Sequence, residues 1–125
     1  MIAKLQCVVL DCADVLELAR FYQSLLGGVL NQPDPRWALG EGWATLHTDT
    51  KLVLAFQRVE EHRPPRWPDP ARPQQFHLDL GVTDLDQAQE EVLKLGATLL
   101  DVGDAKRSWR IYADPAGHPF CLVRD

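Results

Sequence analysis

The sequence predicts an α+β fold made of two βαβββ modules, and two observations indicate it. A weak internal repeat relates the segment that begins at Cys7 to the segment that begins at His77. In both copies, a strand-length segment, a capped amphipathic helix and further extended segments follow in the same order. The shared positions are Cys7 and His77, Asp14 and Asp84, and, after one inserted residue, Gly27 and Gly96.

Each copy opens with a predicted strand, over 7–12 and 77–82, that is apolar or alternates apolar and polar residues. Asp14 and Asp84 then stand where a helix N-cap is expected, and Glu17 and Gln87 follow three places on, as in a capping box. The apolar faces of the two helices are Leu18, Phe21, Tyr22 and Leu25, and Leu85, Ala88, Val92 and Leu95. Gly27 and Gly96 are placed to end the helices in the left-handed conformation.

Three extended segments complete each module. They cover roughly 37–39, 43–48 and 51–58 in the first copy, and 98–102, 108–113 and 120–124 in the second. The sequence Asp114-Pro-Ala-Gly117 predicts a type I turn. We expect one domain over 1–125, with module one at 1–60, a proline-rich connector at 59–75 and module two at 76–125.

Composition narrows the function classes. A chain of 125 residues suffices for one core, and its net charge of −5 argues against nucleic acid and anionic membranes as partners. No apolar run approaches the ~20 residues that span a bilayer, and the N-terminus is typical of a first strand rather than a signal peptide. The three cysteines lack CxxC spacing, which predicts a protein of the reducing cytoplasm.

Several motifs resemble the vicinal oxygen chelate superfamily, which includes glyoxalase I, extradiol dioxygenases, fosfomycin-resistance enzymes and bleomycin-binding proteins. They are FYQSLLG at 21–27, FQRV at 56–59, WPDP at 67–70, HLDL at 77–80 and DPAGHPFCLV at 114–123, and they are most similar to glyoxalase-like domains. The resemblance spans the chain and implies that the paired modules form a curled mixed-sheet cup that holds a ligand. It implies a fold more firmly than a reaction, because this fold hosts many activities.

The resemblance also implies a set of site residues. Metal-dependent members place four ligands on the first and last strands of the modules, and the matching positions here are Cys7, Gln57, His77 and Cys121. Strand alternation independently places these four, together with Asp11 and Asp79, on the concave side. The resemblance further implies that Trp109 and Ile111 line the cup, and Trp67 in the connector is a candidate lid.

These positions depart from the metal-binding pattern, because Gln57 and Cys121 replace two glutamates. Mg²⁺ and Mn²⁺ favour carboxylates, and Fe(II) oxygenase sites use two histidines and a carboxylate. Asp11 or Asp79 is displaced from the ligand positions by about 7 Å along its strand. The sequence therefore favours no metal, with His77 hydrogen-bonded to one of these aspartates. The alternative is a zinc ion held by Cys7, Gln57, His77 and Cys121.

Three functions stay open. The favoured one is a metal-free module that binds a small hydrophobic or aromatic molecule. The second is a lyase or isomerase of the glyoxalase type, with His77 as general acid or base or with zinc to polarise a carbonyl. The third is a non-catalytic interaction domain. We expect a homodimer, His47 and His62 on the surface or in loops, and Trp37 and Trp43 at sheet edges or a dimer seam.

Overall fold

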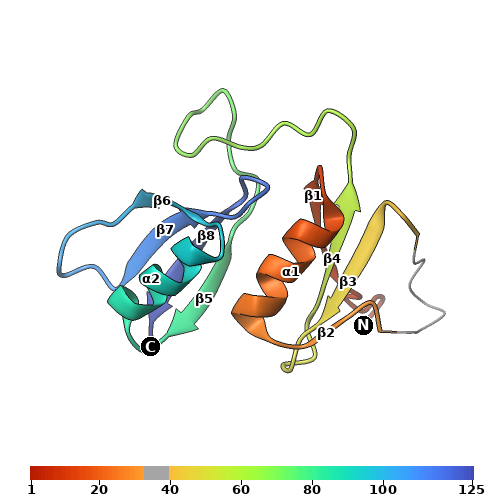
Figure 1. Ribbon diagram of the computed structural model, residues 1–125, viewed down its shortest axis with the longest axis horizontal. Helices are drawn as coiled ribbons and strands as arrows, with labels where there is room; N and C mark the ends of the chain where they lie inside the picture. The colour runs from red at the N-terminus through yellow and green to blue at the C-terminus, as the bar shows by residue number, and fades with distance from the viewer. Residues whose placement is uncertain (33–39) are drawn as a thin grey trace. The chain divides into compact units, whose positions relative to one another are not determined.

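The computed structural model describes residues 1–32 and 40–125, which form two compact units, Met1–His62 and Arg63–Asp125. Each unit contains one helix and one four-stranded sheet (Figure 1). The elements of the first unit, module one, are β1 (Val8–Cys12), α1 (Val15–Leu26), β2 (Val29–Leu30), β3 (Trp43–His47) and β4 (Val53–Arg58). Those of the second, module two, are β5 (Leu78–Val82), α2 (Leu85–Lys94), β6 (Thr98–Asp101), β7 (Trp109–Ala113) and β8 (Pro119–Arg124).

The two sheets have the same topology. In module one the strand order is β1-β4-β3-β2, with β1 parallel to β4 and the other neighbours antiparallel. In module two the order is β5-β8-β7-β6, again with one parallel pair, β5 and β8. Each module is therefore βαβββ with a mixed sheet, and the predicted α+β fold class is confirmed.

Both helices begin at the predicted caps. The Asp14 carboxylate accepts a hydrogen bond from the Glu17 N–H at 3.1 Å, and Asp84 accepts one from the Gln87 N–H at the same distance. These bonds satisfy N–H groups that have no partner within the helix. Helix α1 ends at Gly27, whose φ of 74° is accessible to glycine at little cost.

The core of each module lies between its helix and one face of its sheet. In module one, the buried Tyr22 ring of α1 stacks on Phe56 of β4, with 5.9 Å between centroids. In module two, Tyr112 of β7 and Phe120 of β8 stack at 5.5 Å, and Val92 of α2 is buried as well. The predicted helix faces are correct at most positions, but Leu95 is 39% exposed because α2 ends one residue before it.

The second strand of module one differs from the expected one. Strand β2 follows α1 directly, at Val29–Leu30, and pairs with the end of β3. The expected segment at 37–39, which includes Trp37, lies outside the described residues. The predicted turn at 114–117 is present, with the Gly117 N–H donating to the Asp114 carbonyl at 2.9 Å. Within the described part of the chain, no helix is both long and apolar enough to cross a bilayer.

Candidate ligand-binding faces of the two sheets

In each module, the sheet face opposite the helix, here called the open face, carries the predicted site residues. On module one, Asp11 of β1 pairs with Gln57 of β4, which pairs with Trp43 of β3. Residues opposite one another in register share a face. Phe56 contacts the helix, so its neighbour Gln57 and the whole row lie on the open face. Cys7 is half-buried and comes just before β1.

The corresponding row of module two joins Asp79 of β5, Cys121 of β8 and Ile111 of β7. Tyr112 and Phe120, which belong to the core, occupy the neighbouring register positions and face the other way. Trp109 lies two residues before Ile111 on the same strand and therefore shares its face. The alternation predicted from the sequence thus agrees with the register at these positions.

A cluster of three potential metal ligands lies on module two. His77 Nε2 is 3.4 Å from an Asp79 carboxylate oxygen. Ligand atoms of His77, Asp79 and Cys121 all lie within 4.8 Å of one another. His77 and Asp79 are exposed, whereas Cys121 is buried. The displacement of about 7 Å that argued against Asp79 as a ligand is therefore no obstacle, because its side chain reaches both His77 and Cys121.

The Cys121 thiol is held in its neutral form. Burial is the main cause that raises its pKa to about 11, and the adjacent Asp79 carboxylate raises it further, because a thiolate beside a carboxylate is repelled. Burial also raises the pKa of the Cys7 thiol. In the metal-free protein at neutral pH, Cys121 is therefore a small, weakly polar side chain, as the sequence predicts for it.

Trp109 presents an aromatic ring on the open face of module two. The side chain is 43% exposed, and the Arg107 guanidinium carbon lies 5.0 Å from the ring centroid. Arg107 is fixed by an ion pair with Asp101 at 3.3 Å and by a hydrogen bond to the Trp109 carbonyl at 2.9 Å. The Arg107 hydrogen bond is the largest of the interactions that lower the pKa of the Asp101 carboxyl. These contacts hold the Arg107 guanidinium over the Trp109 ring.

The four positions carried over as zinc ligands are divided between the modules. Cys7 and Gln57 lie in module one, whereas His77 and Cys121 lie in module two. The donors that the structure brings together, namely an imidazole, a carboxylate and a thiol, come from module two alone. This donor set suits Zn²⁺ better than Mg²⁺ or Mn²⁺, because the thiolate is a soft ligand. Trp67 is half-buried in the connector, and its role as a lid stays a prediction.

Two polar groups on the open face of module one were missed. Trp43, Thr45 and His47 alternate along β3 on this face, and the Trp43 Nε1 and Thr45 Oγ1 atoms are buried with no hydrogen-bond partner among the described residues. Trp43 does not lie on an edge strand, because β3 is inside the sheet, and its place at a dimer seam stays a prediction. His47 is a half-buried residue of β3 rather than a loop residue. Because side chains alternate between the two faces of a strand, the sequence of β3 could have placed these three residues on the same face.

Comparisons with known proteins agree with this architecture. A family model described as a glyoxalase-like domain matches residues 7–123. A glyoxalase/bleomycin resistance protein/dioxygenase family enzyme from Burkholderia phytofirmans has a similar structure, with a TM-score of 0.72, 18% identity and 98% of each chain covered. The fosfomycin resistance protein FosX from Listeria monocytogenes matches with a TM-score of 0.69 and 14% identity, over 100% of this chain and 95% of that one.

A second structure of the Listeria monocytogenes protein, its E126Q mutant, is complexed with Mn(II) and 1S,2S-dihydroxypropylphosphonic acid. It matches with a TM-score of 0.67 and 16% identity, over 99% of this chain and 93% of that chain. None of the curated proteins matches the sequence. At these identities the structural likeness concerns the fold.

Proposed function

Because the chain belongs to the glyoxalase-like domain family, we propose that it binds a small, partly aromatic molecule on the open face of module two, without a metal. The observation that carries this proposal is the exposed Trp109 ring, stacked on Arg107 on the same face as the His77–Asp79 pair. An aromatic ligand gains from stacking, and a few placed polar groups orient it.

The side chains of this face form an apolar end and a polar end. Trp109 and the half-buried Ile111 on β7 supply the apolar surface, while Asp79 on β5 and His77 just before it supply hydrogen-bonding groups on the other side of β8. Metal is not required for this mode of binding. The residues at the two glutamate positions, Gln57 and Cys121, are consistent with that, because neither supplies the carboxylate that the family's metals use.

A ligand-observed NMR screen of one-ring and two-ring aromatic compounds tests this proposal. Wild-type protein should bind a subset of the panel, and EDTA should leave binding unchanged. Trp109→Ala should weaken binding about tenfold, because stacking contributes ~1 kcal/mol beyond the buried area. Trp109→Phe, the matched control, retains a ring and should retain most of the affinity. If Trp109→Ala binds as tightly as the wild type, the ligand does not occupy this face.

A second candidate is a lyase or isomerase of the glyoxalase type, and the cluster of His77, Asp79 and Cys121 favours it. In this candidate function, Asp79, which lies 3.4 Å from His77, would orient the imidazole as a general acid or base. The same three side chains would hold Zn²⁺ with one position open, and zinc supplies a Lewis acid for a carbonyl substrate. Zinc content in protein purified without chelator, compared between wild type, His77→Ala and Cys121→Ala, separates this candidate from the metal-free one.

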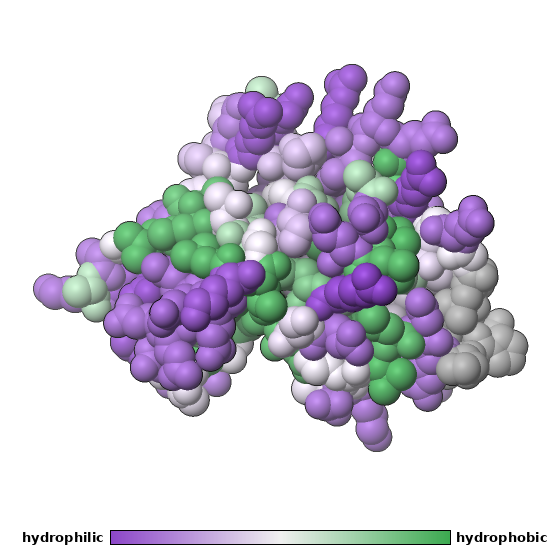
Figure 2. Space-filling model, viewed as in Figure 1, coloured by the Kyte–Doolittle hydropathy of each residue, from purple (hydrophilic) through white to green (hydrophobic). Residues whose placement is uncertain are grey.

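We also infer a cytoplasmic homodimer. Cys7, Cys12 and Cys121 form no disulfide with one another, which supports a reducing compartment. Exposed apolar side chains near the end of α2 and on or beside β6 support pairing, and Figure 2 shows the apolar area over this part of module two. They are Leu93, Leu95, Leu99 and Val102. Absence of any ligand or metal in the two screens would instead favour a non-catalytic interaction domain.

A further inference from the structure

We propose that Arg107 is the positioning residue of the aromatic site on module two, where its guanidinium covers one side of the Trp109 indole and leaves the other side for a ligand. This inference rests on the function proposed above and deepens it, because it identifies what fixes the orientation of the stacking ring. The guanidinium carbon lies 5.0 Å from the ring centroid, which is within the range of a cation–π contact. Trp109 is nevertheless 43% exposed, so a ligand reaches the surface that Arg107 does not cover.

All three nitrogen atoms of the Arg107 guanidinium donate hydrogen bonds. Nε donates to the Trp109 carbonyl at 2.9 Å, Nη1 to an Asp101 carboxylate oxygen at 3.3 Å, and Nη2 to the Asp101 carbonyl at 3.2 Å. The Arg107 side chain is only 19% exposed. A planar group held by several directional bonds has little freedom to rotate. Arg107 is therefore a fixed support for the ring and not a mobile cation that waits for an anion.

Gly103 provides the space in which the guanidinium lies. A Cβ atom at this position would collide with Nε and the guanidinium carbon of Arg107, and would lie 2.7 Å from Nη2. The φ of Gly103 is 66°, which glycine adopts at little cost. The Gly103 N–H donates to Asp101 Oδ1 at 2.8 Å, so one carboxylate holds both the glycine and the arginine. Any side chain at position 103 would displace the guanidinium from the ring.

Closing the loop between β6 and β7 does not require this contact with the ring. The backbone N–H of Gly103 is bound by the Asp101 carboxylate, and the backbone N–H groups of Lys106 and Arg107 are bound by Asp104 Oδ1 at 2.9 and 3.0 Å. These backbone bonds shape the loop by themselves, as aspartate side chains commonly do in turns. The guanidinium adds the contact with Trp109, and we assign it the role of orienting the indole.

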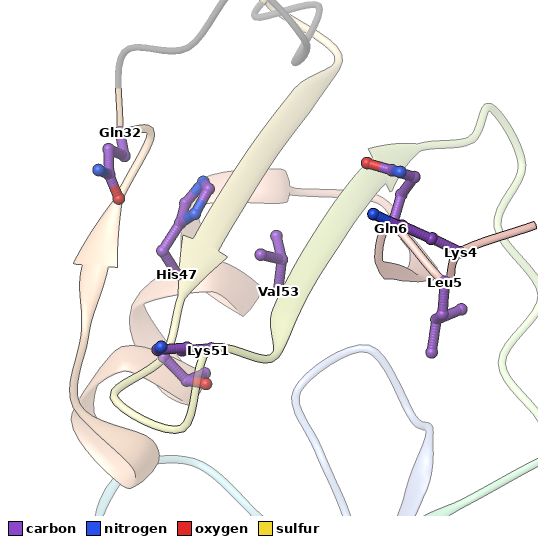
Figure 3. Close-up of a pocket in the computed structure, with 8 residues that line it drawn as sticks. Lys4, Leu5, Gln6, Gln32, His47, Lys51 and Val53 are labelled. Carbon is purple, nitrogen blue, oxygen red and sulfur yellow. The ribbon is translucent and has the colours of Figure 1, made fainter.

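The cavity of module one lacks the features that make the Trp109 face suitable for an aromatic ligand. Figure 3 shows that Lys4 and Lys51 lie on opposite sides of Val53, so these two ammonium groups do not converge. The described residues that line this cavity of about 410 Å³ include no tryptophan, tyrosine or phenylalanine. The contact of Arg107 with Trp109 instead joins a fixed cation to an exposed ring, and we expect the aromatic ligand there.

The ¹⁵N heteronuclear NOE of the indole N–H measures the order of the Trp109 ring, and Trp109→Phe identifies its signal. Arg107→Met keeps an unbranched stem but removes the donors, so this NOE should fall well below that of the β7 backbone amides. Affinity for p-cresol, the probe, should fall at least threefold, because binding must then order the ring. Arg110→Met is the matched control and should change neither quantity by more than a quarter. Arg110 is 17% exposed and pairs with Asp86 at 2.8 Å.

A second pair of variants moves the guanidinium while Arg107 is retained. Gly103→Ala should reduce the NOE and the p-cresol affinity as Arg107→Met does. Gly96→Ala is its control, because Gly96 has a φ of 112° and incurs backbone strain, but a Cβ atom there would meet only Pro115, at 3.7 Å. Gly96→Ala should leave the indole signal unchanged.

An indole that stays as ordered in Arg107→Met and Gly103→Ala as in the wild type would overturn the proposal, whether or not p-cresol binds. Unchanged p-cresol affinity beside a mobile ring would overturn it as well, and so would an equal loss of order in Arg110→Met. If p-cresol does not bind the wild type and the ring still loses order in both variants, the hold of Arg107 on Trp109 is upheld and the proposed binding of one-ring aromatic compounds fails.

Discussion

Cys121 is the residue whose chemistry depends most directly on a neighbour. Its pKa of about 11 is raised first by burial and then by the Asp79 carboxylate opposite it in the register. In Asp79→Asn the repulsion between carboxylate and thiolate disappears, so the pKa of Cys121 should fall. Because the thiolate is the reactive form, alkylation of Cys121 by iodoacetamide at pH 8.5 should become several-fold faster.

Mass spectrometry of the digested protein follows each cysteine separately, with EDTA present so that metal does not contribute. Cys7 is the internal control, since burial alone accounts for the raised pKa of its thiol and Asp79 does not contribute to it. Its alkylation rate should be the same in wild type and variant. Equal rates at Cys121 in the two proteins would mean that Asp79 does not interact with the thiol in solution.

At the residue scale, the sequence predicted which side chains share a face but not which of them touch. A period of two residues places Asp79 and Cys121 on the open face without knowledge of the partner strands. Their contact depends on the parallel register of β5 and β8, which pairs residues 42 positions apart and leaves no local signal. The 3.4 Å approach of His77 to Asp79 involves one of the two aspartates that the sequence offered as partners of His77, but strand spacing alone does not choose between Asp11 and Asp79.

At the scale of the element, the cap of α2 offers a local test of stability. Asp84→Ala removes the acceptor of the Gln87 N–H and should lower the free energy of unfolding by about 1 kcal/mol. Asp84→Ser retains a capping oxygen, so its free energy of unfolding should fall by only a few tenths of a kcal/mol. Urea denaturation followed by circular dichroism measures both. A loss of the same size in the two variants would point to the charge of Asp84 rather than to its hydrogen bond.

The contact between α2 and β7 rests on a polar side chain. The Tyr112 hydroxyl donates to Gln89 Oε1 at 2.9 Å, and Arg110 Nη1 donates to the same oxygen at 3.1 Å. Tyr112 is fully buried, and Gln89→Ala removes the acceptor of its hydroxyl group. The substitution should therefore lower the free energy of unfolding by about 1–2 kcal/mol. Glu90→Ala, one residue further along the helix, removes only an exposed pair with Lys94 and should change the stability by less than about 0.5 kcal/mol.

The helices, whose ends are marked by nearby residues, were predicted from the sequence, whereas strand β2 was not. Asp14, Asp84 and Gly27 mark helix ends through hydrogen bonds and dihedral angles that involve only a few residues of chain, so they can be recognised from the sequence. Strand β2 has only two residues, Val29 and Leu30, and owes its existence to pairing with the end of β3. A strand that short has no periodicity from which to predict it.

On the scale of the whole molecule, the internal repeat explains why the fold class could be predicted although most single motifs are weak. Both modules carry the same order of elements, and both sheets place the first strand parallel to the last. The duplicated pattern is therefore stronger than either copy alone. The repeat gives no such help in predicting the function, because the site residues differ between the two copies. They are Cys7 and Gln57 in module one, and His77 and Cys121 in module two.

The oligomeric state is the property of the whole molecule that the exposed apolar residues of module two predict. Among the described strands, β6 lies at the edge of its sheet, and Leu99 on β6 is 37% exposed. An edge strand with exposed apolar side chains is a template for pairing with another chain. Sedimentation equilibrium should therefore give twice the chain mass of 14.1 kDa. Leu99→Lys should give the mass of one chain, because the charge would be desolvated at the interface.

Leu16→Lys on α1 of module one replaces an apolar residue of similar exposure, 43%, and should remain dimeric. A dimer that survives Leu99→Lys but dissociates in Leu16→Lys would move the interface to module one. A wild-type protein that sediments as one chain at about 100 µM would contradict the homodimer itself. In that case the exposed leucines beside β6 need another occupant, since an apolar area at an unpaired edge favours association with some partner.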